Sequence, residues 1–232
     1  MQAFPKEVHY FDRNYERGSS WYRSHFPTRM AVAVVGRRTG VRPAVGETTP
    51  GYLFHPLVPA RVARLLPEAK FILLLRNPVD RAYSSYWHRV AQGYETLPDF
   101  EDALDAEQSR LEGELELMVQ DGSYNSEKRR LYSYTARGLY AEQLERWLAH
   151  FARNRFLIES SEQLFQDPAA VLRRICRFLG LPEWLPATYK TYNALTSGSM
   201  KPSTRKNLAQ YFEPHNRRLY AMVGRTFDWD DA

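Results

Sequence analysis

The chain has 232 residues, 44% hydrophobic and 25% charged, which is the composition of a globular protein large enough to bury its own core. Its single cysteine, Cys176, excludes an internal disulfide framework and a cysteine-based zinc site. No apolar run is long enough to span a bilayer or resembles a signal peptide at the start of the chain, so we expect one soluble, cytoplasmic domain over residues 1–232.

The formal net charge of +5 combines two unlike regions. Residues 95–121 hold ten acidic residues and one basic residue, Arg110, which leaves 31 basic and 17 acidic residues in the rest of the chain. An excess of basic residues of this size indicates a polyanionic partner, such as a nucleic acid, an anionic polysaccharide or a multiply phosphorylated cofactor. Scattered arginines that only keep the protein soluble would explain the excess equally well.

The first 66 residues are predicted to contain two strands and a helix. Residues 7–11 alternate and are aromatic and β-branched, which predicts a short strand, and residues 31–35 predict a second strand that ends at Gly36. The basic segment 36–40 is interpreted as a hairpin turn, because it lacks the Gly-Lys-Ser/Thr ending of a phosphate-binding loop. Residues 59–66 are predicted to form a helix.

The strongest strand signal is the continuous apolar run of residues 70–75, which is typical of a strand buried on both faces of a parallel sheet. Asn77 and Pro78 then supply an N-cap and a first-turn proline for a helix that runs to about Ala91. A strand, a tight turn and a helix in this order make half of a βαβ unit.

The rest of the chain is predicted to be mostly helical. In the acidic segment 100–119 the acids are expected to form a solvated face opposite an inward face. That inward face comprises Leu104, Leu111, Leu115 and Met118. Further elements are a helix at 139–151, a strand at 155–158, a helix at 169–179 ended by Gly180, a loop at 181–202 and a last helix at 204–223. This alternation indicates an α/β domain with a mostly parallel central sheet flanked by helices.

Two side chains beside the strongest strand could bind one phosphate. Arg76 leaves the strand at its carboxyl end, and Ser84 lies on the second turn of the following helix, so they offer a bidentate cation and a hydroxyl donor. Arg81 is expected to point elsewhere, toward Asp80 or Glu47. Arg-Asn-Pro also occurs as an ordinary helix-start sequence. The residues alone therefore leave open whether the segment binds a phosphate or only starts the helix.

Four segments in order along the chain resemble one family. The run Phe-Ile-Leu-Leu-Leu-Arg-Asn-Pro-Val-Asp-Arg-Ala-Tyr-Ser-Ser-Tyr (71–86) resembles the 3′-phosphate-binding segment of sulfotransferases that use 3′-phosphoadenosine 5′-phosphosulfate (PAPS). Three further segments resemble the heparan sulfate glucosamine sulfotransferases: the strand of the catalytic base (6–12), the substrate-cleft motif (46–53) and the end of the 3-O-sulfotransferase branch (223–229).

The resemblance implies the P-loop-related α/β sulfotransferase fold and transfer of a sulfuryl group from PAPS to a hydroxyl, with a carbohydrate or other small molecule, and not a nucleic acid, as the acceptor. It makes Glu7 the general base, with His9 and Asp12 as its neighbours. On a strand, Glu7 and His9 would share a face. Arg76 and Ser84 carry over to the 3′-phosphate of the cofactor. No metal is required.

The sequence departs from the family in three places. The family's first strand and its loop around the 5′-phosphosulfate lie upstream of the base, and six residues precede Glu7 here, so we expect an N-terminally truncated fold. Lys201 and Arg205 could substitute for a Lys-Gly-Arg cofactor clamp, although solvation explains both equally well. Thr48 replaces a lysine of glycosaminoglycan-specific members, which favours another acceptor, as in bacterial members.

Two rival functions follow from these departures. The first is a catalytically incompetent relative that still binds adenosine 3′,5′-bisphosphate, PAPS or a glycan. The second is a P-loop kinase, which would need a Gly-Lys-Ser/Thr loop and a magnesium-binding aspartate, and the sequence has neither in context.

Overall fold

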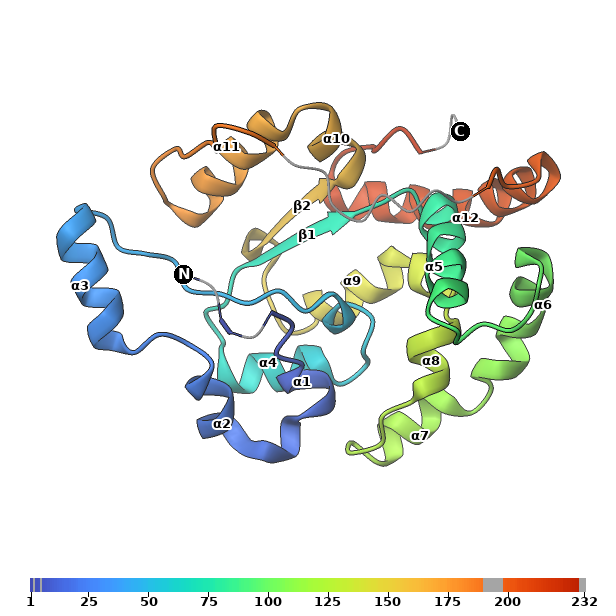
Figure 1. The fold of residues 1–232 in the computed structure, drawn as a ribbon, viewed down its shortest axis with the longest axis horizontal. Helices are drawn as coiled ribbons and strands as arrows, with labels where there is room; N and C mark the ends of the chain where they lie inside the picture. Colours follow the sequence, from blue (N-terminus) through green and yellow to red (C-terminus); the bar gives the residue numbers. More distant parts are fainter. Residues whose placement is uncertain (2, 5, 190–197, 230–232) are drawn as a thin grey trace. The chain divides into compact units, whose positions relative to one another are not determined.

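The structure is a computed structural model that describes residues 1, 3–4, 6–189 and 198–229, and most of these residues are helical (Figure 1). Residues 190–197 of the loop predicted at 181–202 lie outside the described residues. The sheet of the described chain is one parallel pair, in which β1 (Phe71–Leu75) lies beside β2 (Phe156–Ser160). Both strands were predicted, and their presence among helices fits the α/β class.

Contacts along the chain group the residues into two compact units. The first comprises Met1–Leu73, Trp147–Glu159 and Gln163–Tyr189, and the second comprises Leu74–Arg146, Ser160–Glu162 and Lys190–Ala232. Two compact units can be parts of one domain or can be two separate domains. The single domain over residues 1–232 therefore stays a prediction.

The first unit is built around aromatic side chains. Phe71 of β1 stacks on Phe156 with ring centroids 4.8 Å apart, and its edge contacts the rings of Trp147 and Phe151 at 4.9 and 4.7 Å. The helices that lie wholly in this unit are α1 (Tyr10–Arg13), η1 (Tyr15–Arg17), α2 (Gly18–Ser24), α3 (Arg29–Thr39), η2 (Pro50–Tyr52), α4 (Val58–Leu65), η4 (Arg153–Arg155) and α11 (Pro168–Leu179), where η denotes a 3₁₀ helix. The ends of α4 and α11 confirm the predicted helices to within one residue.

The two other strands predicted in this unit are wrong. At residues 7–11, Glu7 and His9 have φ angles of 60° and 52°, which a strand does not allow, and α1 begins at Tyr10. Residues 31–35 belong to the helix α3, because the Thr28 hydroxyl accepts a hydrogen bond from the Ala31 nitrogen and starts a helix there. The segment 36–40 is the end of this helix and not a hairpin turn.

The second unit packs helices around a mixed aromatic and aliphatic core. Its helices are α5 (Pro78–Ala91), α6 (Phe100–Leu111), α7 (Glu114–Gln120), α8 (Glu127–Tyr132), η3 (Ala136–Gly138) and α12 (Pro202–Val223), while α9 (Tyr140–Leu148) and α10 (Ser161–Gln166) have residues in both units. α5 contacts η3, α6 and α12. Gly138 makes this packing possible, because a Cβ there would lie 2.6 Å from the Phe212 ring and 2.9 Å from Cβ of Pro78.

Two burial predictions fail in this region. β1 is not buried on both faces, since Ile72 and Leu74 are 37% and 46% exposed. The acidic segment is broken between α6 and α7 at Gly113, where φ is 72°, and Leu115 is exposed instead of facing inward. Glu107 and Glu114, expected on a solvated face, are buried, as is Glu95 just before the segment.

These buried carboxylates are satisfied by hydrogen bonds. Glu107 accepts from the backbone nitrogens of Thr135 and Ala136 at 2.7 and 2.9 Å, and Glu95 accepts from Arg110 and from the Tyr134 hydroxyl. Hydrogen bonds of this kind offset part of the cost of burying a carboxylate. In the described part of the chain, no helix combines the length and apolar character needed to cross a bilayer.

Candidate functional site

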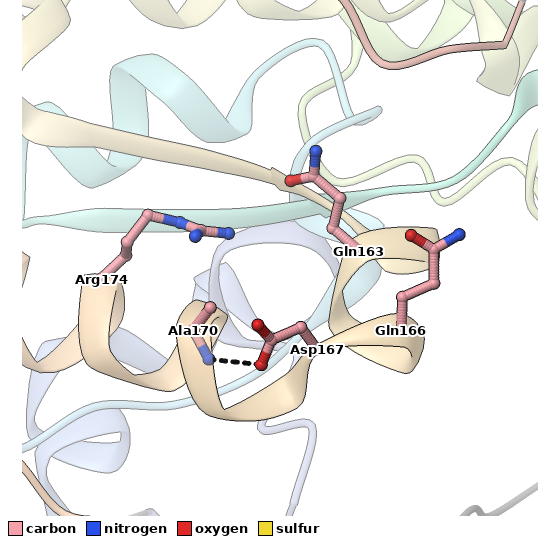
Figure 2. A pocket seen from close by; sticks show the side chains of 5 residues that line it. All are labelled: Gln163, Gln166, Asp167, Ala170 and Arg174. Atoms are coloured by element: carbon pink, nitrogen blue, oxygen red, sulfur yellow. Dashed lines mark hydrogen bonds between the residues drawn. The ribbon is translucent and has the colours of Figure 1, made fainter.

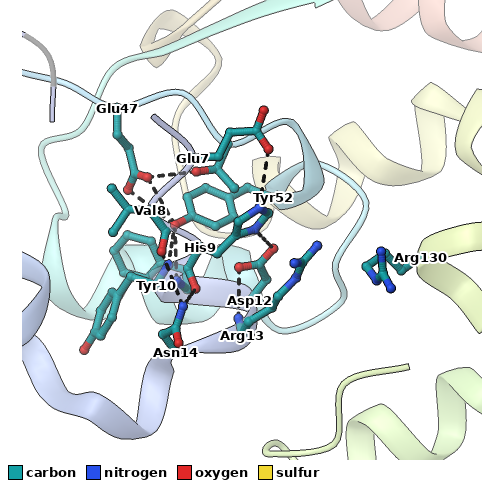
Figure 3. A network of polar contacts seen from close by, with 12 residues as sticks. Glu7, Val8, His9, Tyr10, Asp12, Arg13, Asn14, Glu47, Tyr52 and Arg130 are labelled. Atoms are coloured by element: carbon teal, nitrogen blue, oxygen red, sulfur yellow. Dashed lines mark hydrogen bonds and ion pairs between the residues drawn. The ribbon is translucent and has the colours of Figure 1, made fainter. Parts of the chain in front are cut away.

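The structure brings together the three residues predicted around the catalytic base (Figure 3). Nε2 of His9 lies 3.4 Å from Oε2 of Glu7, and Nδ1 of His9 lies 2.9 Å from Oδ2 of Asp12. The Glu7 side chain is 43% exposed and that of Asp12 is 7% exposed, with His9 between them. The cluster therefore has one carboxylate open to an incoming molecule and one buried carboxylate that orients the imidazole.

The backbone at this cluster is a left-handed turn and not the predicted strand. Positive φ angles at Glu7 and His9 cost about 1–3 kcal/mol each, and such residues persist only where the surroundings hold them. The Asn14 side-chain amide donates to the carbonyl oxygens of Val8 and His9 at 3.4 and 3.0 Å. The shared face expected for Glu7 and His9 thus arises from this turn.

The segment that resembles a substrate-cleft motif contacts the same turn. Thr49 donates a hydrogen bond of 2.9 Å to Oε2 of Glu47, and the Tyr52 hydroxyl lies 3.3 Å from the same oxygen. A Cβ at Gly51 would lie 3.2 Å from Oδ2 of Asp12, so the backbone of the motif approaches the cluster closely. Sequence reasoning did not single out Tyr52, although it lies within the motif.

The predicted phosphate-binding residues surround the start of α5 in the second unit. Asn77 caps the helix, since its Oδ1 accepts from the Val79 nitrogen at 2.9 Å, and Pro78 is its first residue. Arg76 is exposed at the end of β1, and in the described chain no carboxylate forms an ion pair with its guanidinium. Ser84 is half-buried on the second turn of α5.

Two residues that sequence reasoning did not assign to this segment hold it in place. Oε1 of Glu162 accepts from the Asn77 backbone nitrogen at 2.8 Å, and Oε2 accepts from the Trp229 indole at 3.2 Å. The Tyr140 hydroxyl donates to the Arg76 carbonyl at 2.9 Å. Trp229 belongs to the last family-like segment, whereas no local pattern points to Glu162.

The other cations of the predicted cofactor set are engaged by carboxylates. Lys201 lies 3.0 Å from Glu101, whose hydrogen bond raises the pKa of Lys201, and Arg205 lies 2.7 Å from Asp80. The predicted partner of Arg81 is wrong, because its guanidinium donates to the Tyr134 carbonyl instead of pairing with Asp80 or Glu47. Arg205 takes the place beside Asp80 that was expected for Arg81.

A small pocket in the first unit is lined by none of the predicted site residues (Figure 2). It is lined by Gln163, Gln166, Asp167, Ala170 and Arg174. Its volume of about 180 Å³ is below the range of about 300–1,000 Å³ for ligand pockets. Asp167 caps α11, and Arg174 forms two hydrogen bonds of 2.8 and 2.9 Å with the buried Glu159. The charged side chains that line the pocket therefore stabilise the fold. Across the described residues, no group of His, Cys, Asp and Glu side chains could hold a metal ion.

Comparisons with known proteins agree with this arrangement of motifs. The sequence model of the sulfotransferase domain matches residues 8–231. Heparan sulfate glucosamine 3-O-sulfotransferase 3B1 of Mus musculus is 30% identical over 254 residues, which cover 99% of this chain and 58% of that protein. Bifunctional heparan sulfate N-deacetylase/N-sulfotransferase 1 of Caenorhabditis elegans is 31% identical over 189 residues, covering 81% of this chain and 19% of that protein.

A solved structure shares the fold. The sulfotransferase from Alicyclobacillus acidocaldarius is 32% identical to this chain and superposes with a TM-score of 0.70. The match covers 98% of this chain and 87% of that one. The chain spans 58% of the length of the Mus musculus protein, so the likeness concerns part of that protein.

Proposed function

Because the chain belongs to the sulfotransferase family and has its α/β fold, we propose that it transfers a sulfuryl group from PAPS to a hydroxyl group of a carbohydrate. PAPS would supply the activated sulfuryl group when bound. Transfer of this kind is expected to pass through a loose, in-line transition state, as in phosphoryl transfer. The protein then has to orient two substrates, remove one proton and neutralise charge on the leaving group.

The observation that carries the proposal is the Glu7, His9 and Asp12 cluster. Asp12 accepts from Nδ1 of His9, which leaves Nε2 facing Glu7. In the proposed reaction the exposed Glu7 carboxylate takes the proton of the acceptor hydroxyl, while the His9 ring beside it helps to fix where that carboxylate lies. Asp12 keeps the imidazole in the required orientation, as buried carboxylates do in other catalytic clusters.

We assign binding of the 3′-phosphate to Arg76 and Ser84. The exposed Arg76 guanidinium is free of carboxylates in the described chain, and Ser84 offers a hydroxyl on the second turn of α5, so both fit a phosphate. Lys201 and Arg205 complete the proposed set, provided that each exchanges its carboxylate partner for a phosphate oxygen.

A carbohydrate acceptor is supported by the names of the relatives, which describe enzymes that act on heparan sulfate. The basic excess outside residues 95–121 suits an anionic glycan. Thr48, in place of the lysine expected in the cleft motif, favours a glycan with fewer sulfate or carboxylate groups than heparan sulfate.

The test measures transfer of radiolabel from PAPS to heparan sulfate and to unsulfated glycans. Glu7→Gln should lower turnover by about 10²–10⁴-fold with little change in affinity for adenosine 3′,5′-bisphosphate. Glu16→Gln, which alters an exposed carboxylate of the same unit, is the matched control and should behave as wild type. Full activity of Glu7→Gln would exclude Glu7 as the base, and bisphosphate binding without any transfer would favour a binding relative that does not turn over.

A further inference from the structure

The turn that carries Glu7 and His9 is closed by a side chain from a distant part of the chain (Figure 3). The hydroxyl oxygen of Tyr52 accepts hydrogen bonds from the backbone nitrogens of Tyr10 at 2.9 Å and Phe11 at 3.3 Å. These are the first two N–H groups of α1, which have no acceptor within the helix. The His9 side chain does not cap them, so Tyr52 performs the capping.

The proton of the Tyr52 hydroxyl has an acceptor of its own. Glu47 places its two carboxylate oxygens 3.3 and 3.4 Å from this hydroxyl, and Thr49 donates to the same carboxylate. Burial, and next the charge of Glu47, raise the pKa of Tyr52, so the phenol stays protonated at neutral pH. The hydroxyl therefore donates toward Glu47 while its lone pairs remain available to the two N–H groups.

α1 cannot hold this geometry by itself. It is a single turn of four residues, and an isolated helix of this length does not persist in water. Without the cap, the left-handed φ angles at Glu7 and His9 would relax toward the more favourable negative region. The Glu7 carboxylate would then move away from Nε2 of His9.

We propose that Tyr52 is a positioning residue for the Glu7, His9 and Asp12 cluster. Its hydroxyl fixes the start of α1, and thereby the turn in which His9 lies between two carboxylates. The proposal rests on the proposed function, in which Glu7 takes the acceptor proton. Tyr52→Phe isolates the role of the hydroxyl, because phenylalanine keeps the edge contact with the Phe11 ring, whose centroid lies 5.6 Å away.

The test compares Tyr52→Phe with Tyr124→Phe. The control also removes a tyrosine hydroxyl bonded to a glutamate, Glu114 at 2.7 Å, and it lies in the second unit. With PAPS and the glycan that the wild type sulfates best, Tyr52→Phe should lower kcat at least about tenfold, while KM for PAPS changes less than about twofold. Tyr124→Phe should keep both values.

A second readout does not depend on activity. The imidazole nitrogen NMR signals of His9, assigned by their loss in His9→Asn, should shift in Tyr52→Phe and stay in place in Tyr124→Phe. A wild-type protein that transfers nothing to heparan sulfate or to unsulfated glycans would contradict the proposed function, and the NMR comparison would still decide the role of Tyr52. Unchanged His9 signals in a folded Tyr52→Phe would overturn the proposal.

A further variant covers the case in which Tyr52→Phe does not fold. Glu47→Ala leaves the Tyr52 ring in place but removes the carboxylate that orients its hydroxyl. We expect the His9 signals to shift in the same direction in this variant. His9 signals identical to those of wild type would again overturn the proposal.

Discussion

Oε1 of Glu162 accepts a hydrogen bond of 2.8 Å from the backbone nitrogen of Asn77, which is the residue that caps α5. The bond joins positions 85 residues apart and lies next to Arg76, the proposed phosphate ligand. The other oxygen of Glu162 accepts from Trp229, whose carbonyl in turn accepts from the Asn77 side chain at 3.4 Å. The position of the Arg76 backbone is therefore set by residues that do not themselves need to touch a cofactor.

Replacing Glu162 should weaken cofactor binding indirectly. Glu162→Ala removes the acceptor of the Asn77 nitrogen. The loss of one hydrogen bond changes an equilibrium constant by a factor of about 2 to 12. We expect a decrease of this size in the affinity for adenosine 3′,5′-bisphosphate, measured by calorimetry. Glu127→Ala, which removes an exposed carboxylate of the same unit, should bind as wild type. Equal affinity of both variants would show that the bond to Asn77 does not position Arg76.

Arg76 should make the larger contribution to binding. Arg76→Ala is expected to reduce affinity for adenosine 3′,5′-bisphosphate by roughly ten- to a hundredfold, as for lost hydrogen bonds to a charged group. Arg76→Lys should recover only part of this loss, because lysine cannot bind a phosphate through two parallel N–H groups. Arg217→Ala, at an exposed arginine of α12, serves as the control for net charge. Undiminished binding by Arg76→Ala would refute the phosphate assignment.

The close approach at Gly138 predicts a specific loss of stability. Gly138→Ala would place a Cβ 2.6 Å from the Phe212 ring, and overpacking of this kind costs about 1–3 kcal/mol. The free energy of unfolding in urea should fall by that amount. Gly46→Ala is the matched control, because no heavy atom lies within 4 Å of its added Cβ and the φ angle is ordinary. A decrease in unfolding free energy no greater than that of Gly46→Ala would mean that the Phe212 side chain can move to make room for the added Cβ.

Stability at low pH should depend on Glu95. Burial opposes its ionisation, but hydrogen bonds from Arg110 and Tyr134 outweigh burial and lower the pKa of Glu95 to about 2. A carboxylate with a lowered pKa stabilises the fold above its unfolded value of about 4.3, and this stability is lost as pH falls toward the folded value. Glu95→Gln should therefore flatten the decrease in unfolding free energy between about pH 5 and pH 2.

The size of this effect is on the order of 2–3 kcal/mol, and denaturant titration at several pH values measures it. Tyr134→Phe removes one of the stabilising hydrogen bonds, which is 2.6 Å long, and should give an intermediate slope. An unchanged slope in Glu95→Gln would indicate that other carboxylates govern acid unfolding.

Elements whose signals lie within one or two turns were predicted correctly from the sequence. Asn77 and Pro78 start α5, and Gly180 ends α11, because caps act on backbone groups a few residues away. The strands β1 and β2 and the α/β sulfotransferase fold were also predicted, the fold through the order of four motifs.

The failures have two physical causes: a local helix cap at Thr28 that the prediction did not include, and contacts between distant positions. Residues 7–11 and 31–35 have strand-like composition, but a strand also needs a partner that supplies its hydrogen bonds, and the local pattern does not report one. A cap at Thr28 makes the second segment helical, and contacts with Tyr52 and Asn14 hold the first in a left-handed turn. The buried acids were missed because of contacts between distant positions, since the donors to Glu107 are 28 and 29 residues away.

By itself the sequence determined the family, the main helices and the strand pair, and it supplied the hypothesis for the residues of the candidate site. The tertiary structure alone decided how His9 lies between Glu7 and Asp12, and which backbone groups Tyr52 and Glu162 contact, at the start of α1 and at Asn77 respectively. Residue type and order encode chemistry and local backbone preference. The geometry of a site depends on hydrogen bonds between positions far apart in the chain, and these exist only once the chain has folded.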